Sequence, residues 1–321
     1  MNIQIDTVNY LNLTVPPEIV ADTLNIEVSS HAYLPKTDDP ESDWVASVAV
    51  PAFKLIRKRY GHPVPSFCSI GTGSGLDVLA AIELLGADHV GFTDLQSEVV
   101  ETAAKNITNN LRKGKKVIMA YGAGDLLSPL SGQQKYYDVI YENLPNVPLD
   151  GGSGIAEKRN SGHFLEKRRE PIPALVHNNM LDLHFLALLQ ARQFLTENGS
   201  VYSTLGARVN LDIFRLLGLE AGYDSQILTY SWKIQAEAED VLSGYARQEA
   251  AGLGPFHFYL VHDLRTAFSG TSVEETGTGA LEIEKTLVPH QLSATEAWAA
   301  WKNGKEIGHT VAVLQSTPRI K

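Results

Sequence analysis

The stretch Phe67-Cys68-Ser69-Ile70-Gly71-Thr72-Gly73-Ser74-Gly75 decides the fold of this chain. Its apolar beginning is followed by a G-x-G-x-G turn, and the turn leads into Leu76–Leu85, which has an apolar, helix-forming pattern. Glycines permit a tight turn and let a nucleotide-like ligand approach the backbone at the start of a helix. We therefore predict a strand, a ligand-binding turn and a helix, with a purely structural turn as the alternative.

The spacing of the glycines bears on the kind of ligand. In a dinucleotide-binding fingerprint the third glycine falls one residue later, where this chain has Leu76. The difference disfavours a nicotinamide-dependent oxidoreductase.

Beyond the turn, short apolar runs alternate with amphipathic segments. The expected helices cover residues 43–60, 76–85, 97–111, 180–194 and 211–217. The expected strands cover residues 67–70, 90–93, 117–120, 139–141, 200–205, 226–230 and 256–261, with a further strand at 310–315 in the tail. Short buried strands between helices are typical of a parallel sheet covered on both faces. We predict an α/β fold with a Rossmann-like, seven-stranded sheet and helices on both faces.

Three regions are expected along the chain. Residues 1–65 are predicted to form a mostly helical N-terminal cap, residues 66–262 the Rossmann-like domain, and residues 263–321 a C-terminal extension. The polar stretch 145–175 lies inside the central domain. Because loops of this length in a compact domain are usually functional or disordered, we interpret it as an active-site lid.

The composition disfavours several classes of protein. A net charge of -10 and a pI near 5.5 argue against a non-specific nucleic-acid binder, because phosphate binding needs clustered Lys and Arg. The single cysteine, Cys68, excludes an intrachain disulfide and a Cys-based zinc site, and the ten histidines show no pattern of metal ligands. No segment has the roughly 20 apolar residues of a membrane span. We expect a cytoplasmic protein with a small-molecule partner, without metal, nucleic acid or membrane, and leave a homodimer open.

Asp94 ends the second strand of the pattern, 19 positions after Gly75. An acidic side chain at this place can accept hydrogen bonds from both hydroxyls of a ribose. The alternative is a helix cap, formed by Asp94 or by Ser97.

The third strand leads into Gly124-Asp125-Leu126, and the fourth into Glu142-Asn143-Leu144-Pro145-Asn146. With the glycine turn, these sequences resemble the class I methyltransferases, particularly the branch whose fourth strand ends in an Asn-Pro-Pro-aromatic motif. The resemblance implies S-adenosyl-L-methionine as cofactor. Asp125 would accept the adenine amino group and the backbone of Leu126 would face the adenine ring, while Asn143 and Pro145 would lie at the reactive end. The full set of cofactor-binding residues would be Ser69, Gly71, Gly73, Gly75, Asp94, Asp125 and Leu126.

Two positions depart from that family pattern. An acidic residue commonly stands where this chain has Ser69, and Asp77 in the next helix is the candidate to compensate. The aromatic residue that ends the fourth motif is replaced by Asn146. Because that aromatic stacks on flat adenine or amide substrates in the family, a nucleobase or protein-glutamine substrate is disfavoured.

The second half of the sequence resembles two particular groups of methyltransferases. Residues 206–241 (GARVNLDIFRLLGLEAGYDSQILTYSWKIQAEAEDV), 256–261 and 294–315 are similar to the methyltransferase region of plant methionine S-methyltransferases and to bacterial free-arginine N-methyltransferases of nitrosourea (streptozotocin-type) biosynthesis. This similarity implies a free amino acid as substrate. The guanidino group of L-arginine, in specialised-metabolite (antibiotic) biosynthesis, is the leading hypothesis. The alternatives are methionine sulfur, another small amine, or a non-catalytic protein that only binds the cofactor.

The chemistry of the acceptor favours a role for Glu142. A guanidinium arrives protonated, and a carboxylate beside the motif can accept two of its N–H groups. The alternative is a solvent-facing Glu142 or one that pairs with a lysine. Tyr33, Tyr141 and Asp182 are further candidates for the substrate pocket, although Asp182 can equally be a helix-start residue.

Overall fold

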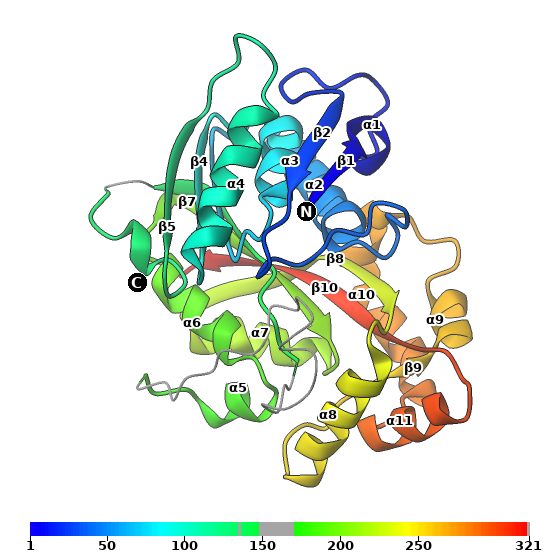
Figure 1. Ribbon diagram of the computed structural model, residues 1–321. Helices are drawn as coiled ribbons and strands as arrows, with labels where there is room; N and C mark the ends of the chain where they lie inside the picture. Colours follow the sequence, from blue (N-terminus) through cyan, green and yellow to red (C-terminus); the bar gives the residue numbers. More distant parts are fainter. Residues whose placement is uncertain (134–135, 148–169, 320–321) are drawn as a thin grey trace. The chain divides into compact units, whose positions relative to one another are not determined.

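The computed structural model describes residues 1–133, 136–147 and 170–319 (Figure 1). The chain divides into two compact units. Unit 1 consists of Met1–Asn143 and Leu189–Tyr202, and unit 2 consists of Leu144–Leu188 and Ser203–Lys321. Strand β7 (Leu195–Ala207) and helix α6 (Asp182–Ala191) each run from one unit into the other.

Unit 1 contains a sheet with the strand order β5-β4-β3-β6-β7, in which β3, β4, β5 and β6 run parallel. Its strands before β7 are β3 (Ser66–Ile70), β4 (His89–Asp94), β5 (Ile118–Ala123) and β6 (Tyr137–Glu142). The connecting helices are α3 (Leu76–Leu85) and α4 (Ser97–Asn109), and a 3-10 turn η2 (Ser128–Leu130) follows β5. Strands β3 and β6 are almost wholly buried, as expected for the centre of a parallel sheet. The predicted α/β, Rossmann-like class is confirmed.

The N-terminal region differs from the mostly helical cap that we predicted for residues 1–65. Strands β1 (Asn2–Asp6) and β2 (Thr23–Glu27) form a two-stranded antiparallel sheet, with the short helix α1 (Thr7–Tyr10) after β1. The buried residues of β2 alternate with exposed ones, which is the period of a strand rather than of a helix. The helix expected over 43–60 is confirmed as the π-helical turn η1 (Val45–Ala49) continued by α2 (Val50–Tyr60).

Polar side chains of α3 and α4 hold this region in unit 1. The Glu83 carboxylate accepts the backbone N–H groups of residues 18, 19 and 20 at 2.7–2.9 Å. Asn106 accepts the N–H of Glu27 and donates to the carbonyls of Glu27 and Ser74. Asn106 therefore links β2 to the glycine turn.

Unit 2 contains the end of β7, from Ser203 on. Its strand order is β7-β10-β8, and the short β9 pairs with β10. Its other strands are β8 (Tyr223–Ile234), β9 (Tyr259–Leu260) and β10 (Ile307–Pro318). Its helices, besides α6, are α5 (Ala174–Asn178), α7 (Leu211–Glu220), α8 (Ala238–Ala250), α9 (Val261–Ala267), α10 (Val273–Leu287), η3 (Val288–His290) and α11 (Ala294–Lys302). Strand β10 runs antiparallel to β8.

One strand prediction in this unit is wrong. Residues 256–261 were expected to complete the sheet, but only Tyr259–Leu260 pair as a strand, and the chain turns into α9 at Val261. In the sheet, β10 lies between β7 and β8, and it comes from the predicted C-terminal extension, residues 263–321. Ten of its residues, from Ile307 to Ser316, are almost all buried, as expected for a strand inside the sheet.

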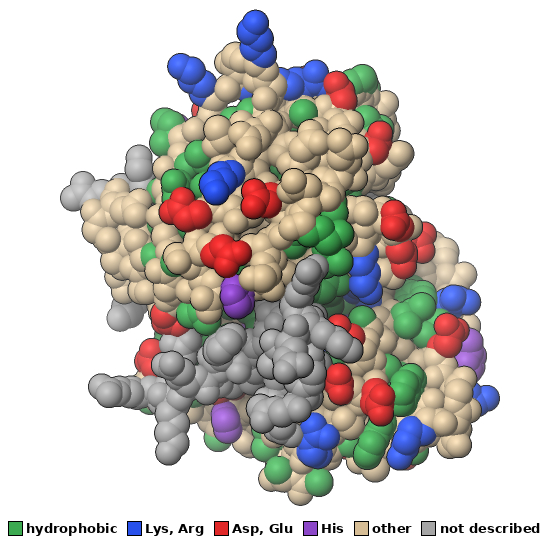
Figure 2. All heavy atoms as spheres, in the orientation of Figure 1, with side chains coloured by type: hydrophobic (Ala, Val, Ile, Leu, Met, Phe, Trp, Pro, Cys, Tyr) green, Lys and Arg blue, Asp and Glu red, His purple; other side chains and the backbone are tan. Residues whose placement is uncertain are grey.

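Other expectations about organisation stay predictions. Residues 148–169 of the expected lid (145–175) lie outside the described residues. The domain boundaries at 65 and 262 stay predictions. Within the described residues, no helix is both long and apolar enough to span a membrane. Acidic and basic side chains are mixed over the described part of the face in Figure 2, and the expectation of no nucleic-acid partner remains a prediction.

Candidate functional site

The glycine turn in unit 1 joins β3 to α3 with three residues in the left-handed region. Gly71, Gly73 and Gly75 have φ values of 73°, 54° and 83°. A Cβ added at Gly75 would lie 3.3 Å from the Cβ of Ala103 on α4, whereas one added at Gly73 would meet no atom within 4 Å. Gly75 thus permits close packing of two helices, and Gly73 faces open space where a ligand can approach.

Asp94, at the end of β4, is bonded to this turn. Its Oδ2 accepts the N–H of Gly73 at 3.0 Å, and its Oδ1 accepts the N–H of Leu95 at 2.8 Å. Burial raises the pKa of Asp94. Helix α4 begins at Ser97 with Gln96 at its N-cap position, so the helix-cap alternative for Asp94 and Ser97 is wrong. The structure places the carboxylate beside the turn, and ribose binding stays a prediction.

Asp77 provides a carboxylate beside Ser69. The Ser69 hydroxyl donates to Oδ2 of Asp77, and the Thr72 hydroxyl donates to Oδ1 at 3.0 Å. Both Ser69 and Asp77 are buried. Burial raises the pKa of Asp77 to about 6, against the opposing effect of these hydrogen bonds. The acid that the sequence lacks at position 69 is therefore present one hydrogen bond away.

A second buried acid, Asp43, lies in the same part of unit 1. It accepts the Tyr10 hydroxyl at 2.8 Å and the backbone N–H of Lys36 at 3.0 Å. The pKa of Tyr10 is raised well above its usual range, first by burial and then by the charges of Asp43 and Asp77. The half-buried Tyr33, a predicted substrate residue, is also close enough to influence the pKa of Tyr10. Sequence reasoning missed Asp43, whose position before the helix at 45–60 resembles that of an ordinary cap.

The turn after β5 is held by a residue that the motif did not include. Gln190 of α6 donates to Oδ2 of Asp125 at 3.0 Å and accepts the N–H of Leu127 at 2.9 Å. Between them, Leu126 has a positive φ of 48°, which is uncommon for a residue other than glycine. Gln190 thus holds the backbone conformation at Asp125 and Leu126, the two residues predicted to bind adenine.

Glu142 ends β6 and is fully buried, which contradicts the alternative of a solvent-facing side chain. In the parallel register its partner is Ile70, the residue before the glycine turn, and Ile70 also pairs with Thr93 of β4. Tyr141, by contrast, packs its ring edge-on against Phe53 at 5.0 Å between centroids. This packing favours a core role for Tyr141 over the predicted substrate contact.

The fourth motif crosses from one unit to the other. Asn143 is the last residue of its segment in unit 1, whereas Leu144, Pro145 and Asn146 belong to unit 2. Asn143 and Pro145 are half-buried. Asn146 is buried, donates to the carbonyl of Gly206 at 3.0 Å and accepts the Tyr245 hydroxyl on its own carbonyl. The polar replacement for the family's aromatic residue therefore points into the interior of unit 2.

Arg208 follows β7 and is buried in unit 2, with an exposure of 3%. Its Nη2 donates to Oε1 of Gln235 at 2.8 Å and to Nε2 of His309 at 3.1 Å. Burial lowers the pKa of Arg208. The pKa of His309 is held well below its usual value by burial and then by the positive charges of Arg208 and Lys233. No local sequence pattern predicts this cluster, because Arg208 follows β7, Gln235 follows β8 and His309 lies in β10.

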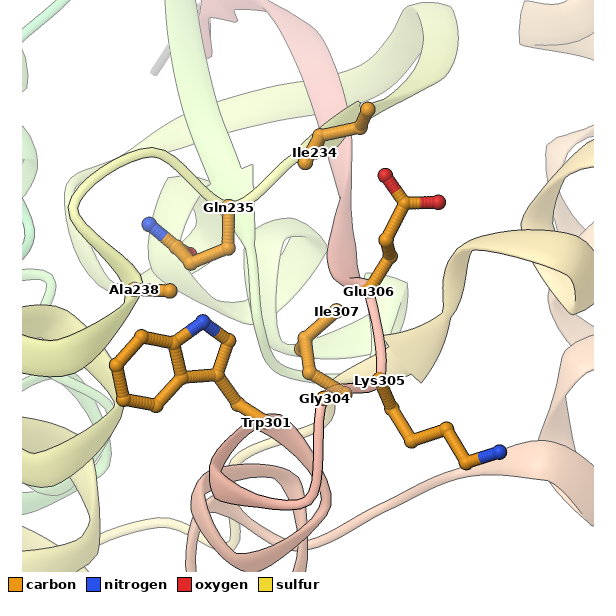
Figure 3. Close-up of a pocket in the computed structure, with 8 residues that line it drawn as sticks. All are labelled: Ile234, Gln235, Ala238, Trp301, Gly304, Lys305, Glu306 and Ile307. Carbon is orange, nitrogen blue, oxygen red and sulfur yellow. The ribbon is translucent and has the colours of Figure 1, made fainter.

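Gln235 also lines a pocket of about 250 Å³ in unit 2, shown in Figure 3. The pocket lies where β8 ends and β10 begins, and the indole of Trp301 forms part of its wall. Its lining residues are Ile234, Gln235, Ala238, Trp301, Gly304, Lys305, Glu306 and Ile307.

Asp182 is buried at the start of α6, as the helix-start alternative expected. Its Oδ1 lies 2.8 Å from Nδ1 of the exposed His177. This pairing occupies one carboxylate oxygen of Asp182, and substrate binding by Asp182 stays a prediction. Among the described residues, no cluster of three His, Cys, Asp or Glu side chains is arranged to hold a metal ion.

In Rossmann-like sheets, nucleotide-like ligands bind at the carboxyl ends of parallel strands, and the turns described above lie at those ends of β3, β4 and β5. No family model matches the chain. It is 26% identical over 192 residues to the release factor glutamine methyltransferase of Bacillus cereus, a match covering 59% of this chain and 61% of the relative. It is 34% identical over 115 residues to the ribosomal protein L11 methyltransferase of an Exiguobacterium species, covering 33% and 35%.

A solved structure of the ribosomal protein L11 methylase of Lactobacillus delbrueckii subsp. bulgaricus is 20% identical, with a TM-score of 0.37, over 66% of this chain and 91% of that one. The chain spans less than two thirds of the length of the curated relatives above. These proteins are what the chain is similar to, and each is a methyltransferase or methylase by name.

Proposed function

We propose that this chain is an S-adenosyl-L-methionine-dependent methyltransferase that methylates a free amino acid, with the guanidino group of L-arginine as the acceptor. The observation that carries the proposal is a row of carboxylates beside the carboxyl ends of β3, β4 and β5 in unit 1. These are Asp77, Asp94 and Asp125. The methyltransferase relatives support the same class of reaction.

The cofactor of this proposed activity, S-adenosyl-L-methionine, supplies a methyl group on a positively charged sulfur. The described residues fit its parts. Asp77 and Ser69 offer hydrogen-bond acceptors to an ammonium group, Asp94 to ribose hydroxyls and Asp125 to an adenine amino group. The open space at Gly73 leaves room for the ligand at the turn.

Glu142 is the residue that we assign to the acceptor. Its buried carboxylate can accept two N–H groups of a guanidinium and so orient one nitrogen for in-line attack. As the N–C bond forms, the C–S bond breaks with its electrons left on sulfur, and the methylated nitrogen gives up one proton. Glu142 is the proposed acceptor of that proton, while Asn143 and Pro145 are proposed to position the nitrogen.

The substrate named for the first relative, glutamine in a release factor, does not fit this chain equally well. Asn146 replaces the aromatic residue of the motif and is turned into unit 2, where it bonds to Gly206. We further propose that the reaction belongs to specialised-metabolite biosynthesis in the cytoplasm. Methionine sulfur is the competing acceptor, because a thioether would not require the charge of Glu142.

The proposal is tested by incubating the chain with labelled S-adenosyl-L-methionine and free amino acids, with detection by mass spectrometry. We expect methylated L-arginine and one equivalent of S-adenosylhomocysteine. Glu142→Gln should lower arginine methylation by about 10²–10⁴-fold, and the exposed control Glu197→Gln should leave it unchanged. Absence of a methylated product from every amino acid would overturn the proposal. Methylated methionine in place of methylated arginine, formed equally well by Glu142→Gln, would favour methionine sulfur as the acceptor, and unchanged arginine methylation in Glu142→Gln would refute the role of Glu142. A thermal shift with NAD but not with S-adenosylhomocysteine would refute the cofactor.

A further inference from the structure

The pocket shown in Figure 3 lies wholly within unit 2, and backbone hydrogen bonds hold its walls. The N–H of Gln235 donates to the carbonyl of Ile307 at 2.9 Å, which joins the end of β8 to the start of β10. The N–H of Gly304 donates to the carbonyl of Trp301 at 2.8 Å and closes the turn after α11. The fold itself therefore defines this pocket of about 250 Å³.

Trp301 gives the pocket a half-buried aromatic wall. Within the described part of the chain, its indole N–H has no hydrogen-bond acceptor, and no Lys or Arg lies over its ring. Trp298, one turn earlier in α11, differs in this respect, because the ammonium group of Lys302 lies 3.9 Å from its ring centroid. A cation over an indole is a favourable contact, so the ring of Trp301 can attract a cation from outside the chain.

Glu306 provides a negative charge at the rim of the pocket. Its side chain is exposed, and no described residue forms an ion pair with it. Figure 3 shows its carboxylate on the side of Ile234, whereas the side chain of Lys305 extends away from the indole. The charge turned towards the pocket is therefore the negative one.

The other walls of the pocket are aliphatic. They are formed by Ile234, Ala238 and Ile307, and Ile234 is 45% exposed although its side chain is large and apolar. Aliphatic walls can cover a carbon skeleton, while an aromatic ring and a carboxylate both attract a positive charge. An anion would meet the charge of Glu306 and the negative face of the ring. Pockets for drug-sized ligands have roughly 300–1,000 Å³, so this smaller pocket suits a small molecule.

We propose that this pocket binds a small organic ammonium ion. The ring of Trp301 and the carboxylate of Glu306 recognise its charge, and the aliphatic walls contact its carbon atoms. The pocket contains none of the residues that are predicted to bind the cofactor or the methyl acceptor. The inference therefore goes beyond the proposed function and does not depend on it.

Three molecules with one carbon skeleton and different charges test the proposal. They are 3,3-dimethylbutylamine, 3,3-dimethylbutan-1-ol and 3,3-dimethylbutanoate, which are cationic, neutral and anionic at pH 7. Each is titrated into the full chain labelled with ¹⁵N, and the indole N–H resonance of Trp301, assigned by its loss in Trp301→Phe, is followed by NMR. We expect the amine to bind about five- to ten-fold more tightly than the alcohol in low salt, and the carboxylate to bind most weakly. Added salt should reduce the preference for the amine.

A matched pair of variants tests the role of Glu306. Glu306→Gln should remove most of the preference for the amine over the alcohol. Glu239→Gln makes the same change at an exposed position of α8 that does not line the pocket, and it should keep the preference. Both substitutions are at exposed positions, so neither is expected to impair folding.

Several results would overturn the proposal. Equal affinities for the three probes would show an apolar surface without selection for charge, and tighter binding of the carboxylate would show an anion site. An unshifted Trp301 resonance with all three probes would show that the pocket binds none of them. A failure of the chain to bind S-adenosylhomocysteine would count against the methyltransferase proposal and leave this inference intact.

Discussion

Asp77 links the stability of unit 1 to pH. Its pKa is raised to about 6 by burial, whereas an unfolded chain has an aspartate pKa of about 3.9. Between these values the folded chain holds more protons than the unfolded chain, so the free energy of unfolding falls as pH rises from about 4 to 6 and is level above that. The loss is on the order of 3 kcal/mol.

Asp77→Asn should remove this dependence, because an amide does not titrate. Urea denaturation of the wild type and Asp77→Asn at pH 4, 5, 6 and 7 measures the difference in stability between them. That difference should change in favour of the variant as pH rises. Asp38→Asn, at an exposed position, is the control, and its stability should change with pH as that of the wild type does. A constant difference between Asp77→Asn and wild type would show that Asp77 titrates normally.

At the residue scale, sequence reasoning located Asp94, Asp125 and Glu142 because each lies at the carboxyl end of a strand or just after it. All strands of a parallel sheet bring their carboxyl ends to one edge, so position along the chain is enough. Asp43, Gln190 and Arg208 could not be found in this way. Their partners lie far away in the sequence: Gln190 is 65 residues from Asp125, and Arg208 is 101 residues from His309.

At the scale of elements, the glycine turn makes a matched pair of substitutions informative. Gly75→Ala strains a positive φ and also brings a Cβ to 3.3 Å from Ala103, whereas Gly73→Ala imposes only the strain of its positive φ. We expect Gly73→Ala to lower the free energy of unfolding by about 1 kcal/mol and Gly75→Ala by roughly 1–3 kcal/mol. Urea denaturation measures both. Equal losses would mean that the contact between α3 and α4 adjusts freely.

Helix α6 reaches the turn after β5 through one side chain, Gln190. Gln190→Leu removes a donor to Asp125 and the acceptor for Leu127, so the left-handed conformation at Leu126 loses support. The thermal shift on adding S-adenosylhomocysteine should fall, with about a ten-fold loss of affinity for two hydrogen bonds. Gln193→Leu, exposed after the same helix, should keep the full shift. An unchanged shift in Gln190→Leu would show that this turn does not contact the ligand.

The elements that sequence reasoning placed correctly are those with local signals. The unit β3-turn-α3 has an apolar run, glycines at fixed spacing and a helical pattern in one continuous stretch. Strands β1 and β2 have five residues each and pair with each other across a long separation in the sequence, 21 residues at Gln4 and Asn25. Strand β10 was found as a strand, but its place between β7 and β8 depends on pairing that no local pattern encodes.

At the scale of the whole molecule, the two units share secondary structure. Strand β7 and helix α6 each begin in one unit and end in the other, so unfolding either unit removes part of a strand and of a helix from its counterpart. We therefore expect a single cooperative transition in urea rather than two. Trp44 reports on unit 1, and the other three tryptophans, Trp232, Trp298 and Trp301, report on unit 2.

The test compares two variants, Trp44→Phe and one in which the three tryptophans of unit 2 are replaced by phenylalanine. Fluorescence of each variant, followed with circular dichroism on the same sample, should give coincident midpoints. Adding S-adenosylhomocysteine should move both signals together, because a ligand bound to the native state stabilises every part that unfolds with it. Two midpoints, with only the Trp44 signal moved by the ligand, would show that the units unfold independently and that β7 and α6 do not couple them.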